Sequence, residues 1–310
     1  MDVFRSKEEI VSKRPAAVAL GFFDGLHIGH VELITKCVDF AKSSGLSADV
    51  FTFQDHPRNI LSGKLIIPRL LTESEKLKYL EELGVDRVYN FDFSDGFHTM
   101  PPFDFAKGFL WDLFTAEAVF CGFDYHFGAG ASGDSKALSD FGDNIGYETY
   151  ILDPVYVEKR LVSSSLIRRC INSGEVEPAG RLLGRDYGFT GLVEKGRELG
   201  RSFGFPTANI VPDPDLTLPA RGVYVTETYE NGICHPSVTN VGINPTVSGG
   251  KAVVRIETHL LDTDCSLYEK EISVFFKKML RKERRFESKD ALVRQIAKDE
   301  EKARLYFQYR

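Results

Sequence analysis

The sequence lacks the features that mark secreted, zinc-binding and membrane-spanning proteins. Its five cysteines are widely scattered and include no Cys-x-x-Cys pair, which argues against a disulfide framework or a zinc site and favours reduced thiols. No apolar run approaches the ~20 residues needed to cross a bilayer, and the first nine residues contain no apolar signal region. We therefore expect a cytoplasmic protein that has no membrane partner.

The chain also has no excess of positive charge. It carries 39 Lys and Arg against 45 Asp and Glu, a net charge of -6, which argues against a nucleic-acid partner. The one basic run, residues 277–285, is better explained as a solvated strand end and loop. What the chain does have is length, because 310 residues with 43% hydrophobic content can bury a substantial core and favour about two domains.

Hydrophobic patterning divides the chain into two parts. Up to residue 183, short apolar strands alternate with helical stretches, which predicts an α/β domain with a parallel sheet. From residue 184 to 310, short runs with period-2 alternation are broken by Gly, Pro and Asn, which predicts an antiparallel β-barrel followed by one C-terminal helix. The predicted strands of the first part are Ala16–Leu20, Ala48–Phe53, Arg87–Phe91, Ala118–Cys121 and Glu148–Leu152.

Three helices have recognisable signals. A capping box from Thr72 to Glu75 predicts a helix that Gly84 ends, and a second helix is expected from about Phe103 to Phe114. Ser288 is the expected N-cap of the last helix. The inner face of that helix is predicted to consist of Leu292, Ile296 and Ala297.

Three glycines and two histidines follow the first predicted strand in the segment Gly21-Phe-Phe-Asp-Gly-Leu-His-Ile-Gly-His30. The glycines remove side chains where the backbone must turn and approach a ligand. Backbone N–H groups at the start of a helix attract anions, and His27 and His30, three residues apart, can donate to the same anion without a permanent charge. The segment therefore predicts a site for a nucleoside triphosphate.

The alternative for this segment is a structural or metal-binding histidine pair. Zinc helices place two histidines four residues apart with a Glu between them, whereas here Gly29 precedes the second histidine and no Cys lies nearby. The glycine spacing also differs from the dinucleotide fingerprint and from the Walker loop. Phosphate binding is the favoured interpretation.

A series of motifs in a fixed order resembles the family of bifunctional bacterial riboflavin kinase and FAD synthetase (FMN adenylyltransferase). They lie at residues 21–30, 52–57, 122–128, 162–168, 200–209, 222–224, 240–246, 257–262 and 280–281. The resemblance implies a Rossmann-like nucleotidyltransferase domain at residues 1–183 and a Greek-key riboflavin kinase barrel at residues 184–310. It further implies conversion of riboflavin and ATP to FMN, then of FMN and ATP to FAD and pyrophosphate, with Mg²⁺ in both steps.

FAD synthesis needs no general base, because the phosphate of FMN is already largely dianionic near pH 7, its second pKa being about 6. The site instead needs donors and cations that align this phosphate and stabilise the departing pyrophosphate. Within this site, Asp24 would shape the first turn and Asp124 would contact the nucleotide or its metal. Ser163–Ser165 would open a helix whose N–H groups, with Arg168, bind the phosphates, and an ordinary helix cap is the less favoured alternative. By resemblance, the ATP-binding residues are Gly21, Phe23, Asp24, His27, His30, Asp124, Ser163, Ser164, Ser165 and Arg168.

Riboflavin phosphorylation differs, because a ribityl hydroxyl is a poor nucleophile until a base accepts its proton. The resemblance assigns that base to Glu257, which without the family would be an ordinary solvent-facing residue of a strand. Thr207 and Asn209 share one face and would offer a hydroxyl and an amide oxygen to Mg²⁺. The remaining kinase residues implied are Gly200, Gly204 and Pro206 in a loop over the ATP phosphates, and Arg281, which would reach the flavin from a mobile flap.

Four residues depart from the family pattern. Asp55 stands where Pro is usual, His126 where Arg is usual, Thr263 where an aromatic is frequent and Glu269 where Gly is usual. Two other functions remain open: a nucleotidyltransferase for another phosphorylated acceptor with a non-catalytic barrel, and a flavin sensor without turnover. Oligomeric state, domain orientation and transfer of FMN between the two sites are not predicted.

Overall fold

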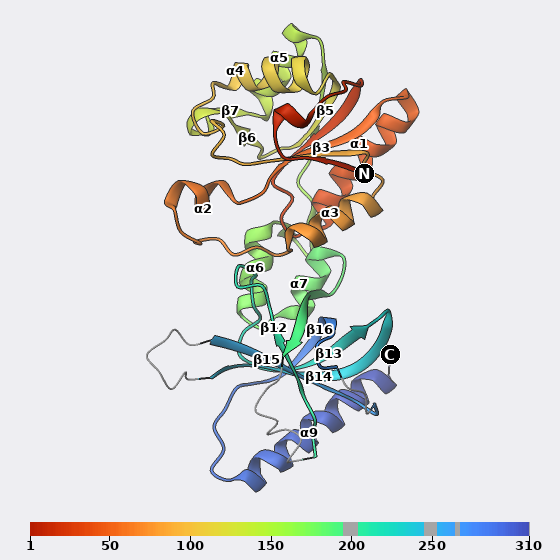
Figure 1. The fold of residues 1–310 in the computed structure, drawn as a ribbon, viewed down its shortest axis with the longest axis vertical. Coiled ribbons are helices and arrows are strands. Elements are labelled where there is room, and N and C mark those ends of the chain that lie inside the picture. The colour runs from red at the N-terminus through yellow and green to blue at the C-terminus, as the bar shows by residue number, and fades with distance from the viewer. Residues whose placement is uncertain (195–203, 245–252, 264–266, 310) are drawn as a thin grey trace. The chain divides into compact units, whose positions relative to one another are not determined.

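The chain consists of two compact units, Met1–Ser164 and Ser165–Arg310 (Figure 1). The computed structural model describes residues 1–194, 204–244, 253–263 and 267–309. No helix within these ranges is long and apolar enough to cross a membrane. The sequence-based boundary between residues 183 and 184 stays a prediction.

The first unit is built on a six-stranded parallel sheet in the order β1-β4-β3-β2-β5-β8. All five predicted strands are confirmed to within two residues at each end. Among the six strands of this sheet, only the three-residue strand β1 was not predicted. The strands are β1 (Asp2–Phe4), β2 (Ala16–Leu20), β3 (Ser47–Phe53), β4 (Arg87–Phe91), β5 (Ala116–Gly122) and β8 (Glu148–Leu152). Two small hairpins are β6 (His126–Phe127) with β7 (Gly133–Asp134), and β9 (Tyr156–Val157) with β10 (Arg160–Leu161).

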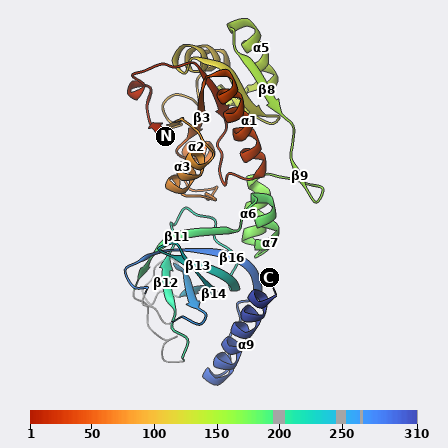
Figure 2. The same ribbon diagram turned by 90° about the vertical axis from the view of Figure 1, so that its right-hand side faces the viewer.

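Helices cover both faces of this sheet (Figures 1 and 2). On one face, Ala17 and Ala19 of β2 pack in a core with α1 (Ile28–Ser44) and α3 (Glu73–Glu82). On the other, the alternate β2 residues pack with the π-helical segment η2 (Phe105–Leu113) and with α5 (Ser135–Ile145). Because β2 is covered on both faces, its five residues are all apolar and buried. The shorter elements of this unit are η1 (Lys7–Glu9), α2 (Pro57–Ser62), α4 (Pro102–Asp104) and η3 (Ala129–Ala131). The second unit begins with α6 (Ser164–Asn172), whose first residue still belongs to the first unit, and α7 (Val176–Leu183).

Two helix predictions can be compared directly with the structure. The capping box is present, since the Thr72 hydroxyl accepts from the Glu75 N–H at 3.3 Å and the Glu75 carboxylate accepts from the Thr72 N–H at 2.9 Å. The helix expected from about Phe103 to Phe114 is divided into α4 and η2, and the N–H of Phe114 reaches back to the carbonyl of Phe109. Its position is confirmed, but most of it is π-helical rather than α-helical.

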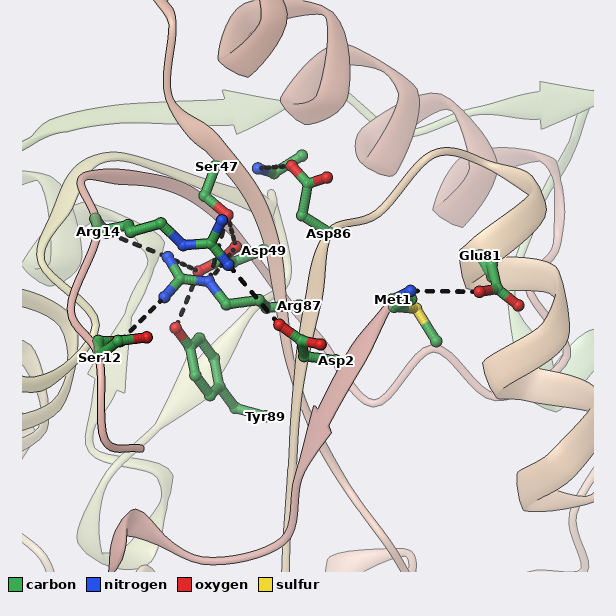
Figure 3. Close-up of polar contacts among 11 residues, drawn as sticks. Met1, Asp2, Ser12, Arg14, Ser47, Asp49, Glu81, Asp86, Arg87 and Tyr89 are labelled. Carbon is green, nitrogen blue, oxygen red and sulfur yellow. Dashed lines mark hydrogen bonds and ion pairs between the residues drawn. The ribbon is translucent and has the colours of Figure 1, made fainter. Parts of the chain in front are cut away.

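A buried ion pair lies at the amino ends of β3 and β4 (Figure 3). The Arg87 guanidinium is 3.0 Å from the Asp49 carboxylate, and Tyr89 donates to the same carboxylate at 2.9 Å. Burial raises the pKa of Asp49, and the neighbouring Arg87 opposes this rise. Arg87 also donates to the backbone carbonyls of Ser12 and Arg14, so it fixes the segment that enters β2. This network lies at the opposite edge of the sheet from the carboxyl ends of the strands.

The second unit contains a closed antiparallel barrel, as predicted, in the order β11-β12-β15-β14-β13-β16. Its strands are β11 (Tyr187–Glu194), β12 (Ala208–Val211), β13 (Gly222–Glu230), β14 (Ile233–Asn244), β15 (Val253–Leu260) and β16 (Glu271–Lys282). Part of its interior is polar. The buried hydroxyls there hydrogen-bond to one another, and they belong to Thr226, Thr228, Ser237, Thr239 and Thr258.

Helix α9 (Lys289–Gln308) packs along the barrel (Figure 2). The Ser288 hydroxyl accepts from the Ala291 N–H at 3.2 Å and caps the helix, as predicted. The predicted inner face is wrong in part. Ala297 is exposed, and the buried residues are Asp299 and Ala303. Apolar spacing could not reveal this face because it contains a carboxylate, which is buried against the Arg281 guanidinium at 2.8 Å.

Candidate active sites

The first candidate site lies at the carboxyl edge of the parallel sheet. The chain runs from β2 to β3 and β4 in one direction and then returns to β5 and β8 on the other side of β2. Ligands of open α/β sheets bind outside the carboxyl ends of the strands at such a reversal. The loop after β2 holds residues 21–27, and the loop after β5 holds Asp124.

The loop after β2 has an unusual backbone supported by buried side chains. Phe23, Gly25 and Leu26 have φ angles of 53°, 81° and 40°, in the left-handed region that favours glycine. Phe23 and Leu26 are each only 1% exposed, so burial of their side chains holds the turn in place. A Cβ at Gly21 would lie 2.8 Å from the Phe23 ring, which explains the glycine by the packing of its own loop.

His27 and His30 lie together at the start of α1, as predicted. Their rings are stacked with centroids 3.5 Å apart. The Nδ1 atom of His27 accepts from the His30 N–H at 3.2 Å, so His27 is the N-cap and carries its hydrogen on Nε2 in the neutral ring. Among the described residues, the buried Nδ1 of His30 has no hydrogen-bond partner. Burial, helped by His27, also holds the pKa of His30 well below its usual value, so this ring is neutral near pH 7.

Asp24 and Ser164 join the start of α6 to the same loop. The Asp24 carboxylate accepts from the Leu70 N–H at 2.8 Å, and its backbone carbonyl accepts from the Ser164 hydroxyl at 2.9 Å. Asp24 is 5% exposed, and these two hydrogen bonds connect the turn to Leu70 and to Ser164. Ser163 directly precedes α6. Ser165 and Arg168 are in α6 but belong to the second compact unit, so their proposed contacts with the nucleotide stay predictions.

Asp124 and two of the departures from the family pattern lie on the loops of the first unit. Asp124 is exposed after β5, and its carbonyl accepts from Nδ1 of His126 at 2.9 Å, which turns the His126 ring back onto its own loop. Asp55 forms an ion pair with Arg69. The aspartate at a position where proline is usual therefore has a partner of its own in this chain.

Lys76 of α3 was not anticipated by the sequence analysis. It is 6% exposed, and its ammonium donates to the Phe53 carbonyl at 3.0 Å and lies 3.4 Å from the Thr52 hydroxyl. Thr52 donates in turn to the Phe22 carbonyl at 2.9 Å, which connects Lys76 to the loop after β2. Burial lowers the pKa of Lys76 to about 8. The signal was its position four residues before the fully buried Leu80, on the same helix face.

The second candidate site is a row of polar residues across three strands of the barrel. Asn209 of β12 pairs with Glu257 of β15, which pairs on its other side with Asn240 of β14. The flanking residues Ile256 and Thr258 are buried inside the barrel. Because side chains alternate along a strand, the three paired residues lie on the opposite face. Asn240 had no predicted role, and only the strand register places it beside Glu257.

The row combines a carboxylate with an unpaired amide oxygen. Glu257 is partly buried, and burial raises its pKa while Arg255 opposes the rise. The Oδ1 atom of Asn209 is buried and has no hydrogen-bond partner among the described residues. A buried unpaired acceptor calls for an explanation, and an amide oxygen is a suitable ligand for a hard cation such as Mg²⁺. These residues therefore fit the predicted metal site.

The other predicted kinase residues have mixed outcomes. Thr207 lies directly before β12, and Gly204 has a φ of 83°, so the loop uses the conformational freedom of that glycine. Gly200 lies outside the described residues. Arg281 belongs to β16 and donates to Asp299 of α9, while its place in a mobile flap and its contact with the flavin stay predictions. This long-range pairing joins the end of β16 to α9.

The other two departures lie near the barrel. Glu269 has a φ of 62°, a left-handed conformation that explains why glycine suits this position. The Thr263 hydroxyl donates to the Leu261 carbonyl at 3.3 Å. Neither residue is part of the row formed by Asn209, Glu257 and Asn240.

The two units combine a nucleotide-binding type of α/β fold with a closed barrel, and they carry two chemically different candidate sites, which is the pattern of a transferase with two reactions. Comparison with known proteins gives two family matches, FAD synthetase over residues 9–166 and riboflavin kinase over residues 183–307. The bifunctional riboflavin kinase/FMN adenylyltransferase of Listeria monocytogenes is 35% identical over 94% of this chain and 92% of its own. The proteins of the same name from Bacillus subtilis and Escherichia coli K12 are 33% and 34% identical, also over 94% of this chain and 92% of theirs.

A solved structure supports the same arrangement of folds. A crystal structure described as a macrolide-efflux protein from Streptococcus pneumoniae is 31% identical, with a TM-score of 0.88 over 97% of this chain and 98% of its own. The chain belongs to the family of bifunctional riboflavin kinase/FMN adenylyltransferases. It is an enzyme of flavin cofactor biosynthesis whose substrates and products are ATP, riboflavin, FMN and FAD. The predicted family, fold class and function are confirmed, rather than a nucleotidyltransferase for another acceptor or a flavin sensor without turnover.

Proposed function

We propose that each reaction belongs to one of the two predicted domains: FMN is adenylylated at the sheet edge of residues 1–183 and riboflavin is phosphorylated on the barrel of residues 184–310. The observation that carries this division is the row on the barrel, where a partly buried glutamate pairs with an asparagine whose amide oxygen is buried and unpaired. The sheet edge instead offers stacked imidazoles at the start of a helix. A proton acceptor suits an alcohol substrate, whereas neutral donors suit a phosphate that is already ionised.

In the kinase reaction, Glu257 accepts the proton of the ribityl hydroxyl as its oxygen attacks the γ-phosphorus of ATP, and ADP leaves. Burial favours this role because it raises the pKa of the carboxylate and makes it a stronger base. Asn209 and Thr207 would hold Mg²⁺ through an amide oxygen and a hydroxyl, and the bound ion would neutralise phosphate charge. Gly200, Gly204 and Pro206 would form the loop over the phosphates, and Arg281 would contact the flavin.

In the adenylyltransferase reaction, a phosphate oxygen of FMN attacks the α-phosphorus of ATP and pyrophosphate leaves. No side chain has to remove a proton, since the FMN phosphate is largely dianionic near pH 7. His27, His30 and the first N–H groups of α1 would bind the triphosphate, together with Ser163–Ser165 and Arg168 at the start of α6. Gly21, Phe23 and Asp24 would hold the shape of the loop, and Asp124 would contact the nucleotide or its Mg²⁺.

We further propose that the functional domains are residues 1–183 and 184–310 and that the enzyme works in the cytoplasm. The first proposal is supported by the two family matches, because the FAD synthetase match ends at residue 166 and the riboflavin kinase match begins at residue 183. The second is supported by the cysteines, because the four described ones are free thiols.

The division can be tested with two variants and matched controls. Glu257→Gln keeps the size of the side chain and should lower riboflavin kinase activity by about 10²- to 10⁴-fold, the usual contribution of a general base. It should leave FAD formation from supplied FMN intact. The control is Glu271→Gln on β16, an exposed glutamate of the same barrel. Equal loss of both activities in Glu257→Gln would contradict the proposal.

The reverse experiment combines His27→Asn with His30→Gln. Asparagine can still cap α1, so the helix start survives while both imidazoles are removed. FAD formation should be lost and riboflavin phosphorylation retained. The control is His98→Gln, an exposed histidine of the same unit. Retention of FAD formation by the double variant would show that the imidazoles do not bind the triphosphate.

A further inference from the structure

His259 makes a backbone contact beside the kinase row that none of the assigned roles uses. It lies two residues after Glu257 on the same face of β15. Its Nδ1 atom is 2.7 Å from the backbone carbonyl of Pro206. A carbonyl oxygen only accepts, so the histidine must carry a hydrogen on Nδ1 and donate it to Pro206.

The ring of His259 is held from two other directions. Its Nε2 atom faces the carboxylate of Glu300 on α9 at 4.0 Å, and Arg304 holds that carboxylate at 2.6 Å. The Phe205 ring packs edge-on against the imidazole with centroids 5.8 Å apart. The side chain of His259 is 15% exposed, so contacts from three directions hold the ring although its hydrogen bond to Pro206 lies at the surface.

The carbonyl that His259 holds belongs to the peptide directly before Thr207. Proline fixes its own φ angle, so fixing its carbonyl as well sets the direction in which the chain enters β12. The register pairs Ala208 with Thr258 and Asn209 with Glu257, and one further step of it would place Thr207 opposite His259. The orientation of Thr207 and Asn209 therefore depends on a contact made from the strand that carries Glu257.

We propose that His259 is a positioning residue of the riboflavin kinase site, which through the Pro206 carbonyl sets Thr207 and Asn209 for metal-bound ATP. This inference rests on the proposed roles of Thr207 and Asn209. It predicts a defect in the use of ATP and Mg²⁺ rather than of riboflavin. A merely structural link between β15 and α9 would instead change stability without this selectivity.

The test uses two amides that differ in where they place the donor. The Asn side chain puts its N–H₂ near the position of histidine Nδ1, whereas the Gln side chain puts it near Nε2. In His259→Asn, the KM for ATP and the half-saturating Mg²⁺ concentration should stay within about threefold of the parent enzyme, since the donor is kept. In His259→Gln, both should rise by about 10- to 100-fold, the usual cost of losing a partner of a metal ligand, while the KM for riboflavin is unchanged.

FAD formation from supplied FMN and thermal unfolding are measured on the same samples. Should the Gln variant fail to fold, His259→Ser, whose hydroxyl is too short to reach Pro206, replaces it with the same expected effect. Equal ATP dependence of the Asn and loss variants would overturn the inference, as would a defect confined to riboflavin. Thr207→Val separates this outcome from a failure of the proposed site. If that variant leaves the Mg²⁺ dependence unchanged, the assignment of Thr207 itself is wrong.

Discussion

Replacing Lys76 with methionine should change how the stability of the first unit depends on pH. Lys76 is buried in α3, and its pKa falls from 10.5 to about 8 because burial disfavours the charged form. Lowering a pKa by one corresponds to about 1.4 kcal/mol, so keeping this lysine charged costs the folded state roughly 3 kcal/mol. Below pH 8 the ammonium is protonated in both states and the whole cost is present. Between about pH 8 and 10.5 the folded protein releases its proton first, so the free energy of unfolding rises with pH.

From pH 7.5 to pH 10, the free energy of unfolding of the parent protein should therefore rise by about 2 kcal/mol relative to that of Lys76→Met. The sequence contains one tryptophan, Trp111 in η2, so its fluorescence during urea unfolding reports on the first unit alone. Lys78→Met is the control, because Lys78 is exposed on the same helix. Parallel pH curves for the parent and Lys76→Met would refute the reasoning.

Two further predictions concern the second unit. Riboflavin kinase kcat/KM should fall as the pH drops through the raised pKa of Glu257, at a higher pH than for an ordinary glutamate. In Glu257→Gln, this acidic limb of the pH–rate profile should be absent. An unchanged acidic limb would assign it to another group. Glu269→Gly should raise the unfolding free energy of the barrel by about 1 kcal/mol by removing a left-handed φ of 62° from a residue with a Cβ. In thermal unfolding, the control Glu271→Gly should instead be destabilising, and a loss of stability in Glu269→Gly would count against the strain.

The sequence predicted the architecture well because the core of each unit follows simple patterns. A strand such as Ala16–Leu20 is apolar throughout because helices cover both of its faces, whereas a barrel strand such as Tyr187–Glu194 alternates because one face is interior. The inner face of α9 was predicted less well. Asp299 is buried there because of its pairing with Arg281, a contact between distant segments that periodicity does not encode.

The candidate sites show the same limit. His27 and His30 could be found from local spacing, since both lie within the first turn of one helix. Glu257 required the resemblance to a known family, because an isolated glutamate in an alternating strand usually faces solvent. Asn240 and Lys76 were missed because their neighbours come from strand register and from packing between elements.

The most direct test of two separate sites is to mix two variants that each lack one of the two activities. Glu257→Gln alone should form little FAD from riboflavin, and the variant with His27→Asn and His30→Gln should stop at FMN. Mixed with riboflavin, ATP and Mg²⁺, the two proteins should form FAD after FMN has accumulated in solution, as chromatography of the flavins over time would show. A mixture that forms no FAD, although each variant retains its one activity, would contradict the account.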